Sequence, residues 1–191
     1  MNTTLPAGNS ACLNRHIEDL KSPIKSMHTI NYEHLMRRTR LCIGIVIFGL
    51  FISGVTAFPL ETELKWMANQ SNDLPQYVQH WLDTVYGAIK TSNNTYPFLS
   101  YGTDWLAFAH VMLAVLFIGP WLKPLQNIWV VQFGMIACVM ILPLAFIMGP
   151  IRGIPIFWSL VDCSFGVLGI IPLYIAYDGI KKLAVLNRRG L

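Results

Sequence analysis

Four apolar stretches determine the solvent in which this chain can fold. Each is about 18 to 24 residues long, and they comprise residues 41–60, 105–122, 128–148 and 154–177. An α-helix needs about 20 mainly apolar residues to cross the roughly 30 Å hydrocarbon layer of a bilayer. Asp162 is the only formally charged residue within the four stretches. The sequence therefore predicts an all-α integral membrane protein, an antiparallel four-helix transmembrane bundle.

The composition supports this prediction and limits what else the chain can contain. Charged residues make up only 13% of the 191 residues, against about 25% in a typical soluble domain. One membrane domain over residues 41–180 is expected, with no room for a separate soluble enzyme domain. Residues 1–40 are expected to form a partly disordered cytoplasmic segment, and residues 181–191 a basic cytoplasmic tail.

The positive residues are distributed unequally between the two sides of the expected bundle. If the N-terminus is cytoplasmic, eleven of the 14 Lys and Arg residues lie on that side, and the other three are Lys65, Lys90 and Arg152. Cytoplasmic loops of membrane proteins are enriched in Lys and Arg. The distribution predicts a multi-pass protein of the bacterial inner membrane with both termini in the cytoplasm. Basic residues that flank spans do not indicate a nucleic-acid partner.

The long outer loop, residues 61–102, contains a helical pattern. Apolar residues recur in it at three- and four-residue intervals, namely Leu74, Val78, Trp81, Val85 and Ile89. This period is typical of an amphipathic α-helix. We expect such a helix over about residues 74–90, lying at the membrane interface.

Short turns and small residues predict how the spans pack. The turns before and after the third span are short, so spans two, three and four are expected to be antiparallel neighbours. In the first span Gly49, Ser53 and Ala57 repeat every four residues. Small residues at this spacing allow close approach of another helix in a membrane.

Two titratable side chains fall inside the expected spans at matching depth. His110 lies about six residues past the expected helix start at Asp104, which is roughly 9 Å at 1.5 Å per residue. Asp162 lies about seven residues past Pro155, or roughly 10 Å by the same rise. Both lie on helix faces with small residues. We therefore expect His110 and Asp162 to point into the bundle, toward each other, in the outer half of the bilayer.

A carboxylate inside the hydrocarbon layer needs a partner, because it costs at least about 2.5 kcal/mol there. An Asp162–His110 pair that shares one proton would supply that partner. One interpretation is that the pair only holds two helices together. The other is a site for a small molecule, a proton or a cofactor, open to the outer face.

Asp104 and Arg152 are expected above this pair, near the outer boundary of the bilayer. Arg152 either extends to a lipid phosphate or forms a bidentate clamp with Asp104 or with an anionic ligand. The chain contains no GxSxG, HExxH, P-loop or GxGxxG motif. The predicted ligand- or proton-binding residues are therefore His110, Asp162, Arg152 and Asp104, with no catalytic or metal-binding set.

Residues 37–58 resemble the first span of membrane cytochrome b subunits. They share the basic start, the apolar run and a Ser53-Gly54 pair near the outer end. The resemblance implies haem b held between paired histidines. This chain departs from that pattern, because His110 is the only histidine in an expected span and His34 precedes the first span on the cytoplasmic side.

Two other segments, Tyr101–Trp105 and Gly149–Pro155, resemble those of small bacterial four-span membrane proteins with no assigned activity. The leading hypothesis is a non-enzymatic accessory subunit or a small-ligand- or proton-binding module. One alternative is an electron-transfer subunit that binds haem b or quinone near His110. Another is a membrane enzyme with His110 and Asp162 as a general acid–base pair. The expected partners are the lipid bilayer and either membrane partner subunits or further copies of the chain.

Overall fold

The computed structural model describes the backbone of residues 7–188 and the side chains of residues 31–71 and 73–188. This part of the chain is helical and contains no strand. The long helices are α1 (Ala7–Ala57), α4 (Ser100–Leu122), α5 (Ile128–Ile151) and α6 (Ile156–Arg188). Between α1 and α4 lie α2 (Leu60–Asn69), the 3₁₀ turn η1 (Ser71–Asp73), α3 (Gln76–Thr95) and the 3₁₀ turn η2 (Pro97–Leu99).

Four helices are long and apolar enough to cross a bilayer, as the sequence predicts. The segments concerned are Asn31–Ala57, Pro97–Leu122, Ile128–Ile151 and Ile156–Arg188. The chain is therefore a multi-pass membrane protein whose helices contact the bilayer. The helix expected in the first long loop is present as α3. Residues 7–40, for which the composition predicted partial disorder, continue into α1 without a break.

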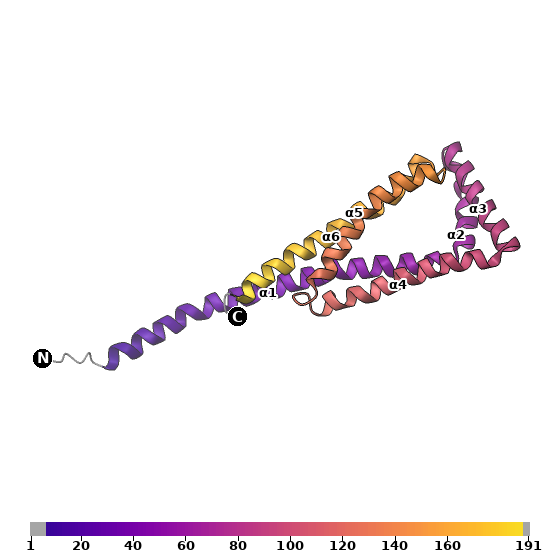
Figure 1. Cartoon of the computed structure of the whole chain (residues 1–191). Helices are drawn as coiled ribbons and strands as arrows, with labels where there is room; N and C mark the ends of the chain where they lie inside the picture. The colour runs from indigo at the N-terminus through magenta and orange to yellow at the C-terminus, as the bar shows by residue number, and fades with distance from the viewer. Residues whose placement is uncertain (1–6, 189–191) are drawn as a thin grey trace.

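The long helices form two closely packed pairs, α1 with α4 and α5 with α6 (Figure 1). Glycines permit the close approach within each pair. A Cβ on Gly54 of α1 would lie 2.8 Å from the carbonyl oxygen of Ala107 in α4. A Cβ on Gly166 of α6 would lie 2.7 Å from the carbonyl oxygen of Cys138 in α5. The two pairs are joined because α6 also packs along α1.

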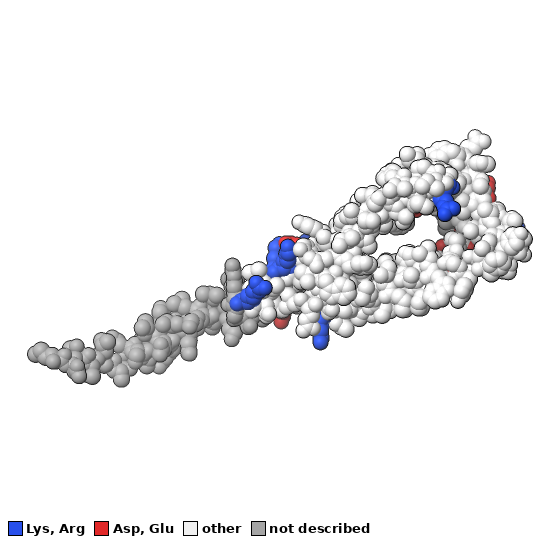
Figure 2. Space-filling model, viewed as in Figure 1, with Lys and Arg blue, Asp and Glu red and all other residues white. Residues whose placement is uncertain are grey.

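A buried core lies near one end of the bundle, which we call the basic end. Basic side chains gather there (Figure 2), and they include Arg37, Arg38, Arg40, Lys123, Lys181 and Lys182. The buried residues of this core are Cys42, Ile43, Phe117, Val130, Val131, Leu173, Ala176 and Ile180. Arg40 Nη2 donates a hydrogen bond of 3.2 Å to the carbonyl oxygen of Leu122, at the last turn of α4. All four long helices contribute to this end, so it holds the bundle together.

The opposite end, which we call the loop end, carries α2 and α3. Toward it the two helix pairs diverge, and the α2–α3 segment crosses the space between them (Figure 1). The segment is connected to one pair through the chain itself, because α2 follows α1 and η2 leads into α4. It meets the other pair through an edge-to-face contact of Tyr77 in α3 with Phe157 in α6, whose ring centroids are 5.3 Å apart.

The structure corrects two predictions about helix contacts. Nothing lies within 4 Å of the position that a Cβ on Gly49 would take, and Gly54 makes the contact with α4 instead. Likewise α4, which was expected to pack on α5 as its antiparallel neighbour, packs mainly on α1. The physical reason is that a short turn sets the direction of the next helix but does not decide which helix face finds a complementary surface.

Candidate ligand-binding site between the helix pairs

His110 lies on the face of α4 that borders the α5–α6 pair. It precedes Phe117 by seven residues, about two turns, and Phe117 is buried where it meets Gly134 of α5. The Nδ1 atom of His110 lies 2.9 Å from the carbonyl oxygen of Leu106. A carbonyl oxygen only accepts hydrogen bonds, so this contact places a proton on Nδ1. The Nε2 atom of the neutral ring is then available as an acceptor.

Asp162 lies on a face of α6 that is buried further along the helix. Leu173 and Ile180 follow it by 11 and 18 residues, close to three and five whole turns, and each is only 1% exposed. Asp162 itself is half-buried. Among the side chains that the structure describes, its carboxyl group has no hydrogen-bond or ion-pair partner. Because an ionised carboxyl group without a partner is costly in hydrocarbon, Asp162 must be protonated, meet water or find a partner beyond the described side chains.

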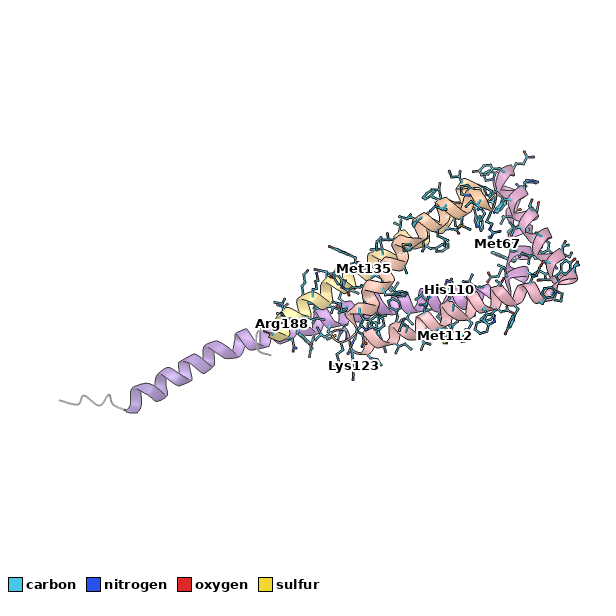
Figure 3. The ribbon with its side chains drawn as sticks, in the orientation of Figure 1. Met67, His110, Met112, Lys123, Met135 and Arg188 are labelled. Carbon is cyan, nitrogen blue, oxygen red and sulfur yellow. The ribbon has the colours of Figure 1, made fainter. Side chains whose placement is uncertain are left out.

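The space-filling view shows an opening between the two helix pairs toward the loop end, with acidic atoms at its margin (Figure 2). We call it the central opening. The α1–α4 pair, which carries His110, lies on one side of it, the α5–α6 pair, which carries Asp162, lies on the other, and the α2–α3 segment lies at its loop end (Figure 1). His110 lies on the edge of the α1–α4 pair that borders the opening, whereas Met112 lies on the far edge (Figure 3). The two titratable residues therefore belong to helix pairs on opposite sides of the opening.

The structure does not contain the expected direct pairing of His110 with Asp162. The ring nitrogen of His110 bonds to its own helix, and no hydrogen bond or ion pair joins it to Asp162. The cause is the divergence of the two helix pairs, which separates faces that would meet if the bundle were packed evenly. A shared proton between these two side chains, which the structural interpretation and the acid–base alternative both need, is not present in this arrangement.

Arg152 and Asp104 are also separated. Arg152 is exposed in the turn between α5 and α6, next to Gly153, whose φ of 67° completes that turn. Asp104 lies in the second turn of α4, on the other helix pair, because α4 begins at Ser100 rather than at Asp104. Within residues 31–188, apart from the undescribed side chain at 72, neither residue forms an ion pair. The structure therefore does not contain the Arg152–Asp104 clamp, which was one of the alternatives for Arg152.

A polar pocket of about 100 Å³ lies at the loop end, where α2, α3 and α4 meet, and Asp104 contributes to its lining. The amide of Asn93 donates a hydrogen bond of 2.6 Å to Oε2 of Glu61, which follows the end of α1. The hydroxyl group of Ser100 donates to Oδ1 of Asn93. This chain of bonds fixes α3 between α2 and α4, and it leaves Asp104 at the edge of the pocket without a partner among the described side chains.

Sequence reasoning did not assign Asn93 and Ser100 to any site. Asn93 is 32 residues from Glu61 in the chain, and it stands in a run of polar residues that is typical of a turn. No periodicity links such distant positions. The one available signal was that α3, as an amphipathic helix, had to end near the start of α4, which places its last polar residues beside the first turn of α4.

The fit of a haem group can be tested on the same geometry. Gly54 of α1 packs at the level of Ala107, one turn from His110, and His34 precedes Gly54 by 20 residues, which is about 30 Å along a helix. His34 and His110 therefore cannot ligate one iron. Among the described residues, no three His, Cys, Asp or Glu side chains are grouped closely enough to hold a metal ion.

Comparisons with known proteins found no relative of this chain. No family model matches the chain, and no curated protein and no solved structure is similar to it.

Proposed function

We propose that this protein is a membrane module that binds a small, membrane-dissolved molecule in the central opening. In this proposal the basic end faces the cytoplasm of a bacterial cell, as the distribution of Lys and Arg favours. The opening then lies in the outer half of the inner membrane. The proposal rests on two titratable side chains that belong to helix pairs on opposite sides of one opening and that have no side-chain partner among the described residues.

The two sides offer complementary hydrogen-bonding chemistry. His110 presents an accepting Nε2 atom, because Nδ1 is used by the carbonyl oxygen of Leu106. The carboxyl group of Asp162 accepts when it is ionised and also donates when it is protonated. A molecule with a hydroxyl or carbonyl head group can bond to both. The surrounding helix faces are apolar, so the rest of such a molecule would be a hydrocarbon ring or chain.

Membrane-dissolved quinones and quinols meet this description, and so do lipids with a small hydroxylated head. Such a ligand would also remove the cost of an unpaired carboxyl group inside the membrane. Binding would therefore stabilise the protein by linkage, since any ligand of the folded state does so in proportion to its concentration.

The experiment is mass spectrometry of the small molecules that co-purify with the full-length protein in an uncharged detergent. We expect one hydroxylated or carbonyl-bearing lipophilic molecule to be retained by the wild type. Asp162→Asn and His110→Phe, which change one side each, should each reduce its retention by about tenfold, the equivalent of one hydrogen bond to a charged or polar partner.

Two matched variants serve as controls. Ser164→Ala alters an exposed residue on α6 whose hydroxyl group bonds to the carbonyl oxygen of Val161. Met112→Leu alters α4 on the far side from the opening. Both should retain the molecule. Equal retention in all five proteins would contradict the proposal. A second polypeptide that is lost with Asp162→Asn would show instead that a partner subunit fills the opening.

A second candidate function is an electron-transfer subunit that binds haem b through His110 as its single histidine ligand, because His34 is too far away to complete a histidine pair. The hydrogen bond from Nδ1 to Leu106 is the kind that orients a metal-ligating histidine and leaves Nε2 for the metal. The resemblance of residues 37–58 to cytochrome b subunits also favours it. We expect protein purified after growth with a haem precursor to show a Soret absorption that His110→Phe removes. Colourless wild-type protein under these conditions would contradict this function.

A further inference from the structure

Three residues with hydrogen-bond donors lie together where the end of α4 packs on α1. Arg40 of α1 donates from Nη2 to the carbonyl oxygen of Leu122 at 3.2 Å. One turn further along α1, a Cβ on Gly44 would lie 3.8 Å from Nε1 of Trp121. Lys123 follows Leu122 directly, in the turn between α4 and α5 (Figure 3). We call Arg40, Trp121 and Lys123 the basic corner.

Hydrogen bonds hold the end of α4 in place and occupy its carbonyl oxygens. The backbone N–H of Lys123 donates to the carbonyl oxygen of Gly119 at 2.9 Å. Nδ2 of Asn127 donates to the carbonyl oxygens of Gly119 and Lys123, each at 3.2 Å. Free carbonyl oxygens at the end of a helix carry partial negative charge and would repel an anion. Because Arg40 also bonds to Leu122, donors cover three of these oxygens, and the corner offers mainly donors to a ligand.

Positive charge is in excess at the basic corner. Arg37 precedes Arg40 by three residues, so it lies on the same face of α1. The sequence from residue 105 to residue 161, which contains the rest of α4 and all of α5, has no Asp or Glu. Glu33, one turn before Arg37, is the acid on this face of α1. The corner and its surroundings therefore carry the charges of Arg37, Arg40 and Lys123 against that of Glu33, which favours an anionic ligand.

Basic residues at the ends of spans are common, but two of those on α6 already have partners within their own helix. Nζ of Lys182 lies 2.6 Å from Oδ2 of Asp178, and Nζ of Lys181 lies 4.6 Å from the centroid of the Tyr177 ring. The cations of the basic corner, by contrast, have no acidic or aromatic partner among the side chains that the structure describes. They are therefore available to an anion from outside the chain.

The basic corner lies at the boundary of the hydrocarbon layer. The spanning segment of α4 ends at Leu122, and the apolar run of α1 begins at Leu41, the residue after Arg40. Leu41, Ile45 and Phe48 are 65%, 54% and 66% exposed, and their spacing places them on one side of α1. An anion held at the corner would therefore have a surface for hydrocarbon chains directly beside it.

We propose that the basic corner binds the phosphate group of an anionic membrane lipid of the phosphatidylglycerol type. Arg and Lys bind phosphate through charge-assisted hydrogen bonds, and basic sites between spanning helices hold acidic lipid head groups. The indole N–H of Trp121 adds a neutral donor for a further oxygen atom. Lipid is the source because the exposed apolar side of α1 continues directly from Arg40. The site involves neither His110 nor Asp162, so this proposal does not depend on the ligand of the central opening.

The test uses the full-length protein in nanodiscs that contain equal amounts of phosphatidylglycerol and phosphatidylcholine with the same acyl chains. Both lipids have one phosphate group, but the trimethylammonium group of phosphatidylcholine cancels its charge. We expect native mass spectrometry to show at least about fivefold more phosphatidylglycerol than phosphatidylcholine retained on the wild type. Equal retention would overturn the proposal, because it would show that the protein collects lipid without regard to charge.

Variants locate the binding. Arg40→Gln and Lys123→Gln should each reduce the retention of phosphatidylglycerol by about fivefold. Because Arg40 also bonds to Leu122, its variant can lower stability, and Lys123→Gln alone then decides. Lys182→Gln is the matched control, because it removes the same charge from the basic end but at a side chain that pairs with Asp178. It should leave retention unchanged. An equal loss in Lys182→Gln would show a general attraction to the basic end and would overturn the assignment to this corner.

A second measurement distinguishes lipid from a soluble phosphate. The probe is glycerol phosphate, which has the charged group of the lipid but no acyl chains, added to the wild type in the same nanodiscs. At concentrations near that of the lipid it should not displace phosphatidylglycerol, because it lacks the contacts with the apolar side of α1. Displacement would keep the anion-binding chemistry of the corner but would overturn the lipid as its occupant.

Discussion

At the basic end, Phe117 of α4 and Leu173 of α6 are almost completely buried in a core formed by four helices. Toward the loop end, where the two helix pairs diverge, the same two helix faces carry His110 and Asp162. Each helix thus keeps one inward face along its length but meets two different environments. Apolar residues stand where the faces meet, and titratable residues stand where the faces separate.

This difference shows that a residue can lie on the inward face of its helix without contacting another helix. In a membrane the lipid is as apolar as the protein core, so helices associate through close packing and polar contacts rather than through hydrophobic burial. A region without close packing can therefore remain open at little cost. Four variants test whether the basic end is closely packed and the loop end is open.

The largest effect is expected from Leu173→Ala at the basic end. Leu173 is 1% exposed, so its truncation leaves a cavity and should destabilise the protein by about 3 kcal/mol. The measurement is thermal unfolding in nanodiscs. Leu168→Ala, on the same helix but 65% exposed, is the control and should change the melting temperature little. Similar losses in both variants would mean that the basic end is not the packed half.

A change of opposite sign is expected from Asp162→Leu in the open half. Replacing an unpaired carboxyl group by an apolar side chain should stabilise the ligand-free protein, by roughly 2.5 kcal/mol if the group lies deep in the hydrocarbon. Thermal unfolding after removal of bound small molecules by detergent exchange is the readout. A lower melting temperature would indicate that Asp162 has a partner within the folded chain and that the two helix pairs close on each other.

A smaller loss, about 2 kcal/mol, is expected from Gly179→Val. A Cβ at Gly179 would overlap the hydroxyl oxygen of Thr39, which is 1% exposed where α1 crosses α6. The matched control is Gly49→Val, because nothing lies within 4 Å of a Cβ at that position. Unfolding in nanodiscs should separate the two variants. Equal melting temperatures would contradict the close crossing of α1 and α6.

The smallest effect is expected from Tyr77→Ala, which removes the edge-to-face contact of α3 with Phe157. Such a ring pair contributes about 1 kcal/mol, so stability should fall slightly. The distance between spin labels on the two helix pairs at the loop end should become more widely distributed. The control is Phe98→Ala, whose exposed ring pairs with Tyr96 within one segment. An unchanged distribution in Tyr77→Ala would show that this contact does not hold the pairs together.

Several features were correctly predicted from local patterns. The four spans follow from apolar length alone, because hydrocarbon excludes charge whatever the arrangement of the helices. The helix in the first long loop was expected over about residues 74–90 and is α3, residues 76–95. Helical periodicity places His110 and Asp162 each on a face with residues that are buried further along the same helix.

The contacts of the candidate site could not be predicted in the same way. His110 and Asp162 were expected to meet because their depths match, but depth gives no lateral distance. A clamp between Arg152 and Asp104 was one alternative, but Asp104 borders the polar pocket together with Asn93. Each of these outcomes depends on which helices pair, and that choice depends on close packing at positions such as Gly54 and Gly166.

Helix length, polarity and the direction of each residue around its helix axis are set by neighbours a few positions away, and they could be read from the order of residues. The separation of the two helix pairs results from contacts between segments far apart in the chain. Because the two helix pairs separate, the expected pair of His110 and Asp162 does not form. A hydrogen bond needs its atoms within about 3 Å, and equal depth in the membrane does not bring two side chains so close.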